Sequence, residues 1–303
     1  MISKLYRIWN RLSWFSAGEA LLVAFGTLWL IIEVLVFFNE SAFANRIRSI
    51  WWLFILLGLV YTILKNWPKS SYSFNVKNRD ASIAITIADI FELEGAKIIT
   101  INNRLDTALN GIVAQSNSIL SFFIKKVYSK NDQHLATDIR NKLEDNTDYY
   151  TSLVIKDNPK EYKIGTVVPI FQNEKQYYLL CNASVNQHGR SKSSPDDLRN
   201  SLVELWAYLI HSGGKEHLII PILGTGRGRI TMTREEVVKE IVLSFLVSLS
   251  NDNYCDKLTV CIHPDDVKKY NLKIDRIVDF VRLHCDNANF AQNVGQQIGQ
   301  RVE

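Results

Sequence analysis

The chain has 303 residues, with 35 basic and 31 acidic side chains, a formal net charge of +4 and 47% hydrophobic residues. This hydrophobic content is sufficient for a core in each of one or two domains and argues against a mainly disordered chain. The small net charge argues against the basic stripe typical of nucleic-acid binding, so we expect no nucleic-acid partner. The four cysteines have neither CxxC nor Cys/His ligand spacing, so we expect buried free thiols and no metal site.

Two apolar runs follow each other near the N-terminus. The first covers residues 20–38 and contains one acidic residue, Glu33, and the second covers residues 50–66 and opens with tryptophans. Their lengths are close to the roughly 20 residues that cross a bilayer. A signal peptide followed by a buried core helix is the alternative, but the first run lacks a small-residue cleavage site and the second follows too closely. Residues 1–67 are therefore predicted to form a two-helix transmembrane hairpin.

The charges around this hairpin predict its orientation. Lysine and arginine residues precede the first run and follow the second, so both termini should be cytoplasmic in a multi-pass protein of the cell inner membrane, in contact with lipid. Residues 2–15 carry apolar side chains at helical spacing and could lie flat on an anionic leaflet. Glu33 is either a residue that reaches the outer interface or a group that forms an interhelical hydrogen bond or lines a pore in an oligomer.

Beyond the hairpin the pattern changes to alternating strands and helices. Residues 68–74 are polar and are predicted as a linker, residues 75–285 as one domain, and residues 286–303 as a polar tail. Thr233 and Glu236 predict a capping box at the start of a helix. The alternation implies an α/β domain with a largely parallel sheet covered by helices on both faces. The runs that predict strands are residues 83–87, 96–101, 167–170, 177–181, 218–222 and 258–262.

A glycine-rich loop directly follows one of these predicted strands and precedes the capped helix. Successive glycines allow backbone N–H groups to surround an anion, and a helix N-terminus adds a favourable dipole. The loop has neither the Gly-Lys-Ser/Thr ending of a Walker loop nor the position of a dinucleotide fingerprint. It therefore predicts a phosphate or diphosphate site on another fold, although tight turns use the same residues. The candidate residues are Gly224, Thr225, Gly226, Arg227, Gly228 and Arg229.

Three segments share their order and spacing with a known family. They are Ile87-Ala88-Asp89-Ile90-Phe91, Thr100-Ile101-Asn102-Asn103 and Pro221-Ile222-Leu223-Gly224-Thr225-Gly226-Arg227. Together they resemble the macro domain that binds ADP-ribose, which implies a macro-like three-layer α/β/α fold over most of the domain. The resemblance also implies that Asp89, with Ile90 beside it, recognises the adenine amino group. It implies that Asn102 and Asn103 border the distal ribose, and that the glycine-rich loop holds the diphosphate.

The segment after these asparagines departs from the usual macro pattern. It reads Arg104-Leu105-Asp106-Thr107 and then has an isolated glycine and scattered serines, where a typical macro domain has a glycine-rich first phosphate loop. This variant, together with the layout of two spans and a C-terminal macro domain, is similar to the two-helix membrane effectors of bacterial Thoeris antiphage defence. The further ligand residues implied are Asp106, Thr107, Ser116 and Ser118.

The resemblance to these effectors implies a function without catalytic residues or a cofactor. The macro domain would bind an ADP-ribose conjugate, with the histidine conjugate made by a TIR-domain partner protein as the expected signal. Binding would drive homo-oligomerisation and membrane disruption, leading to cell death or growth arrest. The alternatives are a membrane-tethered ADP-ribosyl hydrolase that uses Asp106, and a passive receptor for ADP-ribosylated proteins.

A polar turn follows the last predicted strand. His263, Asp265 and Asp266 could belong to a metal or acid/base site, but no second cluster of such residues completes one. We therefore expect this turn to cap the next helix.

Overall fold

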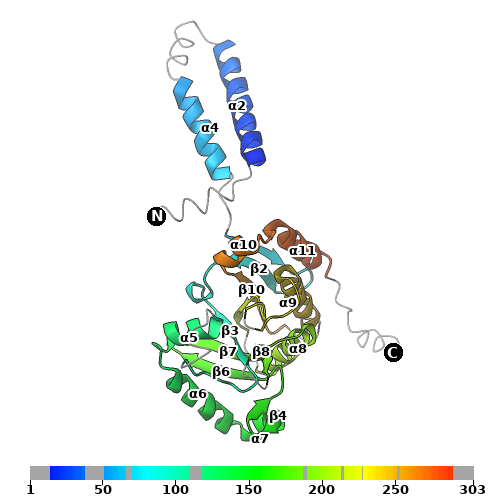
Figure 1. Ribbon diagram of the computed structural model, residues 1–303. Helices are drawn as coiled ribbons and strands as arrows, with labels where there is room; N and C mark the ends of the chain where they lie inside the picture. The colour runs from blue at the N-terminus through cyan, green and yellow to red at the C-terminus, as the bar shows by residue number, and fades with distance from the viewer. Residues whose placement is uncertain are drawn as a thin grey trace, which may run out of the picture. The chain divides into compact units, whose positions relative to one another are not determined.

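A computed structural model describes residues 14–37, 51–65, 70–109, 118–186, 190–212, 215–226, 228–250 and 253–288. The chain divides into two compact units, Met1–Ser70 and Ser71–Glu303. The first contains helices α2 (Trp14–Phe37) and α4 (Trp51–Lys65), labelled in Figure 1. The second contains every strand within the described ranges.

Helices α2 and α4 pack against each other and leave apolar side chains exposed. Leu22, Trp29 and Leu30 on α2 are 73%, 67% and 64% exposed. Within the described ranges, none of the helices combines the length and the apolar character that crossing a membrane requires. The predicted spans over residues 20–38 and 50–66 thus overlap two helices, but the structure does not confirm them as membrane spans.

A mixed β-sheet forms the centre of the second unit. Its strands are β1 (Ser71–Asn75), β2 (Ser82–Ile87), β3 (Ala96–Asn102), β6 (Val167–Gln172), β7 (Lys175–Val185), β8 (Ser191–Lys192), β9 (His217–Pro221) and β10 (Lys257–Ile262). The order is β1-β2-β10-β9-β3-β7-β6, with β8 pairing with β7. Strands β2, β10, β9, β3 and β7 are parallel, whereas β1, β6 and β8 pair antiparallel with their neighbours. A separate antiparallel pair consists of β4 (Val154–Asp157) and β5 (Lys160–Tyr162).

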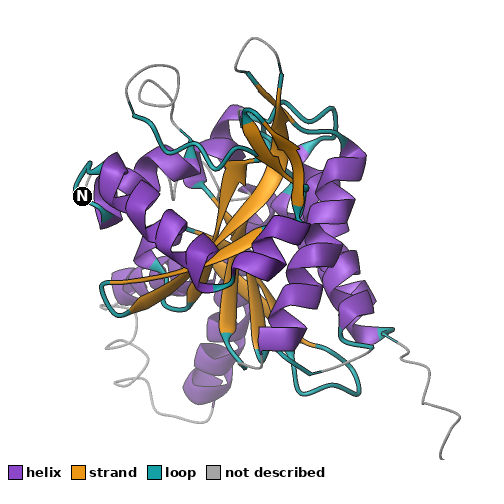
Figure 2. Cartoon of the chain, turned by 90° about the horizontal axis from the view of Figure 1, so that it is seen from below, coloured by secondary structure: helices purple, strands orange, loops and turns teal. Residues whose placement is uncertain are grey.

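Helices cover both faces of the main sheet (Figures 1 and 2). Ile99 and Leu179 share a buried cluster with Phe123 on one face, whereas Ile220 shares the cluster of the other face with Phe245. This arrangement confirms the expected three-layer α/β/α domain. The helices of the first face are α5 (Ile119–Val127), α6 (Asp132–Asp145) and α7 (Thr147–Ser152), and those of the second are α8 (Pro195–Ser212), α9 (Arg234–Ser248) and α11 (Ile274–Asp286).

The chain begins the sheet earlier than the sequence predicts. Residues 71–74, which we expected in a linker, form most of β1. Tyr72 and Phe74 are half-buried and alternate with exposed polar residues, which is the period of a strand with one face toward the core. The hydroxyls of Ser71 and Thr86 lie 2.8 Å apart across the pair. At the other end, α11 is the last described element of the domain. Residues 289–303 of the predicted tail lie outside the described ranges.

Candidate ligand-binding site

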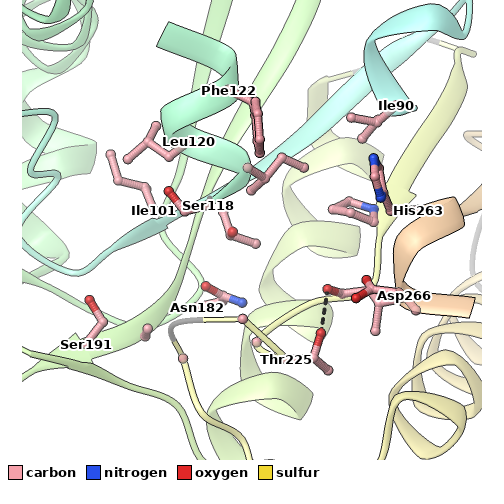
Figure 3. Close-up of a pocket in the computed structure, with 18 of the residues that line it drawn as sticks. Ile90, Ile101, Ser118, Leu120, Phe122, Asn182, Ser191, Thr225, His263 and Asp266 are labelled. Atoms are coloured by element: carbon pink, nitrogen blue, oxygen red, sulfur yellow. Dashed lines mark hydrogen bonds between the residues drawn. The ribbon is translucent and has the colours of Figure 1, made fainter. Parts of the chain in front are cut away.

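A cavity of about 1100 Å³ opens at the carboxyl ends of the parallel strands. This edge is where ligands of such sheets bind. Asp89 follows β2, Asn102 ends β3, Asn182 lies near the end of β7, and His263 follows β10. Figure 3 shows that side chains from several of these strand ends surround one space.

Asp89 forms one wall of the cavity and keeps its negative charge. Its Oδ1 accepts a hydrogen bond from Phe91 N at 3.0 Å, which caps the short helix η1 (Ile90–Glu92), and its Oδ2 accepts one from Lys126 Nζ. Partial burial alone would raise the pKa of Asp89, but the hydrogen bonds from Lys126 and Phe91 outweigh it and hold that pKa below its ordinary value. Ile90, which is buried next to Asp89, also lines the cavity.

The glycine-rich loop lines another part of the cavity, between β9 and α9. Gly224 has a φ of +68°, and a Cβ on Gly228 would lie 2.9 Å from the carbonyl oxygen of Gly224, so both positions need glycine. A Cβ on Gly226 would meet nothing within 4 Å. Gly224, Thr225, Gly226 and Gly228 all line the cavity, ahead of the capped N-terminus of α9. The loop can therefore present backbone N–H groups to an anion.

Arg234, the first residue of α9, connects this loop to helix α10 (Pro264–Lys269). Its Nη2 donates to the carbonyl oxygen of Thr225 at 3.4 Å, and its Nε lies 3.4 Å from Asp266 Oδ1. Its guanidinium carbon lies 3.3 Å from the ring centroid of Tyr270. Sequence analysis missed Arg234, although its position directly after a helix N-cap that follows a glycine-rich loop was a usable signal.

The turn that begins at His263 has two roles. His263 Nδ1 accepts from Asp265 N at 3.2 Å and caps α10, as the sequence predicts. His263, Asp265 and Asp266 also line the cavity, which sequence analysis did not anticipate. The turn follows β10 and lies at the same sheet edge as the other strand ends, which explains why its residues line the cavity. Within the described ranges no group of three His, Cys, Asp or Glu residues is arranged to hold a metal ion.

The two asparagines that were predicted to border the distal ribose have different surroundings in the structure. Asn102 lines the cavity, and its Oδ1 accepts from Arg104 N and Asp106 N at 3.0 and 3.2 Å. Asn103 is buried outside the cavity, where its Oδ1 accepts from Val185 N at 3.0 Å. Asn103 therefore does not line the cavity, because its side-chain amide is bonded to Val185 N and to Glu161.

Two further predicted residues do not line the cavity. Thr107 is buried and donates to the carbonyl oxygen of Asp132 at 3.2 Å, so it fixes the loop instead of facing the ligand space. Arg229, at the end of the glycine-rich loop, has a φ of 49° and is absent from the lining. Ser116 and Arg227 lie outside the described residues.

The remaining predicted residues do line the cavity. Asp106 accepts from Ala108 N at 3.0 Å, and Ser118 caps α5 by accepting from Ser121 N at 3.2 Å. Besides Arg234, sequence analysis missed Lys126 and Asn182. The predicted residues found in the lining are Asp89, Ile90, Asn102, Asp106, Ser118, Gly224, Thr225, Gly226 and Gly228.

This domain is similar to macro domains of known proteins. Residues 83–263 match the family described as Thoeris protein ThsA, Macro domain. No curated protein matches the chain. Among solved structures, a mutant macrodomain of Oceanobacillus iheyensis is 13% identical, over 70% of this chain and 99% of that one, with a TM-score of 0.46. The Oceanobacillus iheyensis macrodomain with ADP is 14% identical, over 70% and 99%, with a TM-score of 0.43. A Trypanosoma brucei macrodomain in complex with ADP-ribose is 11% identical, over 62% and 67%, with a TM-score of 0.42.

Proposed function

Because the chain belongs to the Thoeris ThsA macro-domain family, we propose that its second unit binds an ADP-ribose-like ligand and acts as the sensor of an antiphage defence effector. One observation carries this proposal. The cavity at the strand ends has a loop of backbone donors on one wall and an anionic carboxylate on another. These are complementary to a diphosphate and to an adenine amino group respectively.

The ligand would lie across the strand ends. The adenine amine would donate to Asp89, whose ionised carboxylate has acceptor capacity beyond its present two hydrogen bonds. The diphosphate would lie on the glycine-rich loop, near the N-terminus of α9 and Arg234. The distal ribose would lie near Asn102 and Asp106, which line the same cavity.

We infer that the domain senses its ligand and does not cleave it. The physiological ligand would be a histidine conjugate of ADP-ribose, made by a TIR-domain partner protein. Binding can drive assembly only if the ligand has higher affinity for the assembled state. The alternative, a hydrolase, rests on Asp106, whose carboxylate already accepts from the backbone of its own turn.

We propose that the output step occurs at the cell inner membrane, with both termini cytoplasmic, and that assembled subunits disrupt it. The sequence of the two apolar runs supports this proposal. So do the exposed apolar residues of α2 and α4, such as Trp29, Leu30 and Leu56. Flotation of the protein with inner-membrane vesicles tests the location directly. Flotation with retention at high pH supports it, and release at high pH or absence of flotation contradicts it.

The ligand proposal is tested by calorimetric titration of the detergent-purified full chain with ADP-ribose and its histidine conjugate. Asp89→Ala should weaken binding about tenfold or more, because the adenine amine loses a charged acceptor. Gly226→Glu should abolish binding without unfolding the domain, because the new side chain enters open space and carries a negative charge toward the diphosphate. Asp145→Ala, which removes an exposed carboxylate on α6, is the matched control and should bind normally.

Mass photometry on the same samples separates the functions. Growth in particle mass with the conjugate supports the sensor. Release of free ADP-ribose from a modified protein, lost in Asp106→Ala, would establish the hydrolase instead. Binding with neither change would indicate a passive receptor, and absence of binding to both ligands would refute the ligand proposal.

A further inference from the structure

Asn182 occupies an irregular position in the pairing of two central strands. On β3, Ile101 pairs with Cys181 and Asn102 pairs with Ala183, so Asn182 of β7 has no partner residue across the pair. An extra residue of this kind forms a β-bulge, and bulges next to binding sites redirect a side chain. The bulge lies at the carboxyl ends of both strands, at the edge where the cavity opens.

Hydrogen bonds on both sides fix the backbone of this bulge. Cys181 N donates to the carbonyl oxygen of Thr166 at 2.9 Å, and Asn103 N donates to the carbonyl oxygen of Ala183 at 2.9 Å. The side chain of Asn103 adds a further bond by accepting from Val185 N at 3.0 Å. The direction of the Asn182 side chain is therefore set by the sheet itself.

The amide of Asn182 faces the cavity and is incompletely paired. Asn182 is only 3% exposed, lines the cavity, and its Nδ2 has no hydrogen-bond partner within the described residues. In Figure 3 it lies between Ser118 and Thr225, with the amide nitrogen turned toward the side on which Thr225 lies. Leaving a buried donor unpaired costs free energy, so such a group calls for an acceptor in the cavity.

The other donors in the cavity indicate the chemistry of that acceptor. Gly224, Gly226 and Gly228, whose loop supplies backbone donors, and Arg234 line the same cavity as Asn182, and the Asn182 amide nitrogen is turned toward the side on which Thr225 of that loop lies (Figure 3). A ligand group that meets several donors must accept from all of them, and a phosphate has several acceptor oxygens and a negative charge. We propose that Asn182 Nδ2 donates a hydrogen bond to a diphosphate oxygen of the ligand, together with the donors of the glycine-rich loop. This inference rests on the proposed ligand. It adds a recognition residue on β7, outside the glycine-rich loop and outside the segment that follows Asn103.

The experiment titrates the full-length protein with ADP-ribose and with ADP, which has the diphosphate but no distal ribose. Asn182→Leu removes the donor at similar volume and should weaken both ligands about tenfold, as expected for a hydrogen bond to a charged group. Asn182→Asp keeps the shape but places a carboxylate against the phosphate, so its loss should be larger. Thr259→Val is the matched control, since Thr259 is buried on β10, bonds to His217 and does not line the cavity.

Thermal melting of each variant separates a binding effect from a folding effect. If Asn182→Leu unfolds, the Asn182→Asp variant carries the test. Unchanged affinity in a folded Asn182 variant overturns this inference and leaves the proposed function intact. A loss with ADP-ribose but not with ADP also overturns it, because the amide would then face the distal sugar. If the unmodified protein binds neither ligand, the titrations are repeated with the histidine conjugate of ADP-ribose, and absence of binding to that conjugate as well means that the proposed function and this inference both fail.

Discussion

Asp89 shows how one carboxylate can remain ionised in a partly enclosed wall. Burial opposes its charge, but Lys126 and the Phe91 backbone stabilise it. Lys126 also lies 5.1 Å from the Phe91 ring centroid, so the cation is held over the short helix that Asp89 caps. Asp89, Lys126 and Phe91 are therefore a linked set at this part of the cavity.

Lys126→Met should make ADP-ribose binding more sensitive to acid. Without the Lys126 hydrogen bond, the pKa of Asp89 should rise from its lowered value, so the carboxylate is neutralised at a higher pH as the solution is acidified. The check is the affinity for ADP-ribose between about pH 4.5 and pH 7.5, with Lys142→Met on α6 as the control. Superimposable pH profiles for Lys126→Met and the unmodified protein would contradict the role given to Lys126.

His217 links the stability of the fold to pH. Its burial at the start of β9, followed by repulsion from Lys257 and Lys97, lowers its pKa. Below the ordinary histidine pKa of 6.5 the unfolded chain therefore takes up a proton that the folded domain does not, and stability is lost as the pH falls through the lowered pKa. His217→Gln should reduce the loss of stability between pH 7.5 and pH 5.5 in urea unfolding, because glutamine does not titrate in this range. His211→Gln, at an exposed position on α8, is the control, and equal slopes for His217→Gln and the unmodified protein would contradict the prediction.

At the scale of elements, local signals predict most of the fold. Each of the six predicted strands overlaps a strand of the structure, because apolar runs rich in β-branched and aromatic residues fit the buried strands of a sheet. The capping box of Thr233 and Glu236 is present with both of its hydrogen bonds. The glycine-rich loop lies where predicted because its spacing reflects a local backbone requirement.

The site residues that sequence analysis missed, and the predicted ones that do not line the cavity, depend on contacts between distant segments. Asn182 faces the cavity because β7 bulges against β3, a pairing of residues far apart in the chain. Thr107 turns away because the carbonyl oxygen of Asp132 accepts its hydroxyl. β1 was missed because three of its five residues are exposed and polar. The chemical type of a residue does not reveal which distant segment it will contact. Site residues are therefore harder to predict than the helices and strands that carry them.

Thr233→Ala should lower the free energy of unfolding by about 1 kcal/mol, because α9 loses its N-cap. Thr233 Oγ1 accepts from Glu236 N at 3.2 Å, and Thr233 N donates to Glu236 Oε2 at 2.7 Å. Urea unfolding measures the change. Thr137→Ala is the matched control, because Thr137 lies inside α6 and only donates to the carbonyl oxygen of Gln133. Equal losses of unfolding free energy in the two variants would show that the N-cap hydrogen bonds do not stabilise the domain more than an ordinary threonine inside a helix.

At the scale of the molecule, the second unit contains both its core and its cavity. All cavity-lining residues lie between Ala88 and Tyr270, and the two main buried clusters lie within the same unit. A fragment that begins at Ser71 should therefore fold and bind ADP-ribose with the affinity of the full chain. Calorimetry on both proteins checks this. An affinity weaker by more than a few fold would mean that the first unit contributes to the binding site.

β1, the first element of the second unit, joins the sheet close to the cavity. Ser71 pairs with Thr86, three residues before Asp89, so the chain joins the sheet on the same rim that carries the cavity. Only the β1–β2 pairing, which includes the contact between the Ser71 and Thr86 hydroxyls, separates this edge of the cavity from the first residue of the second unit.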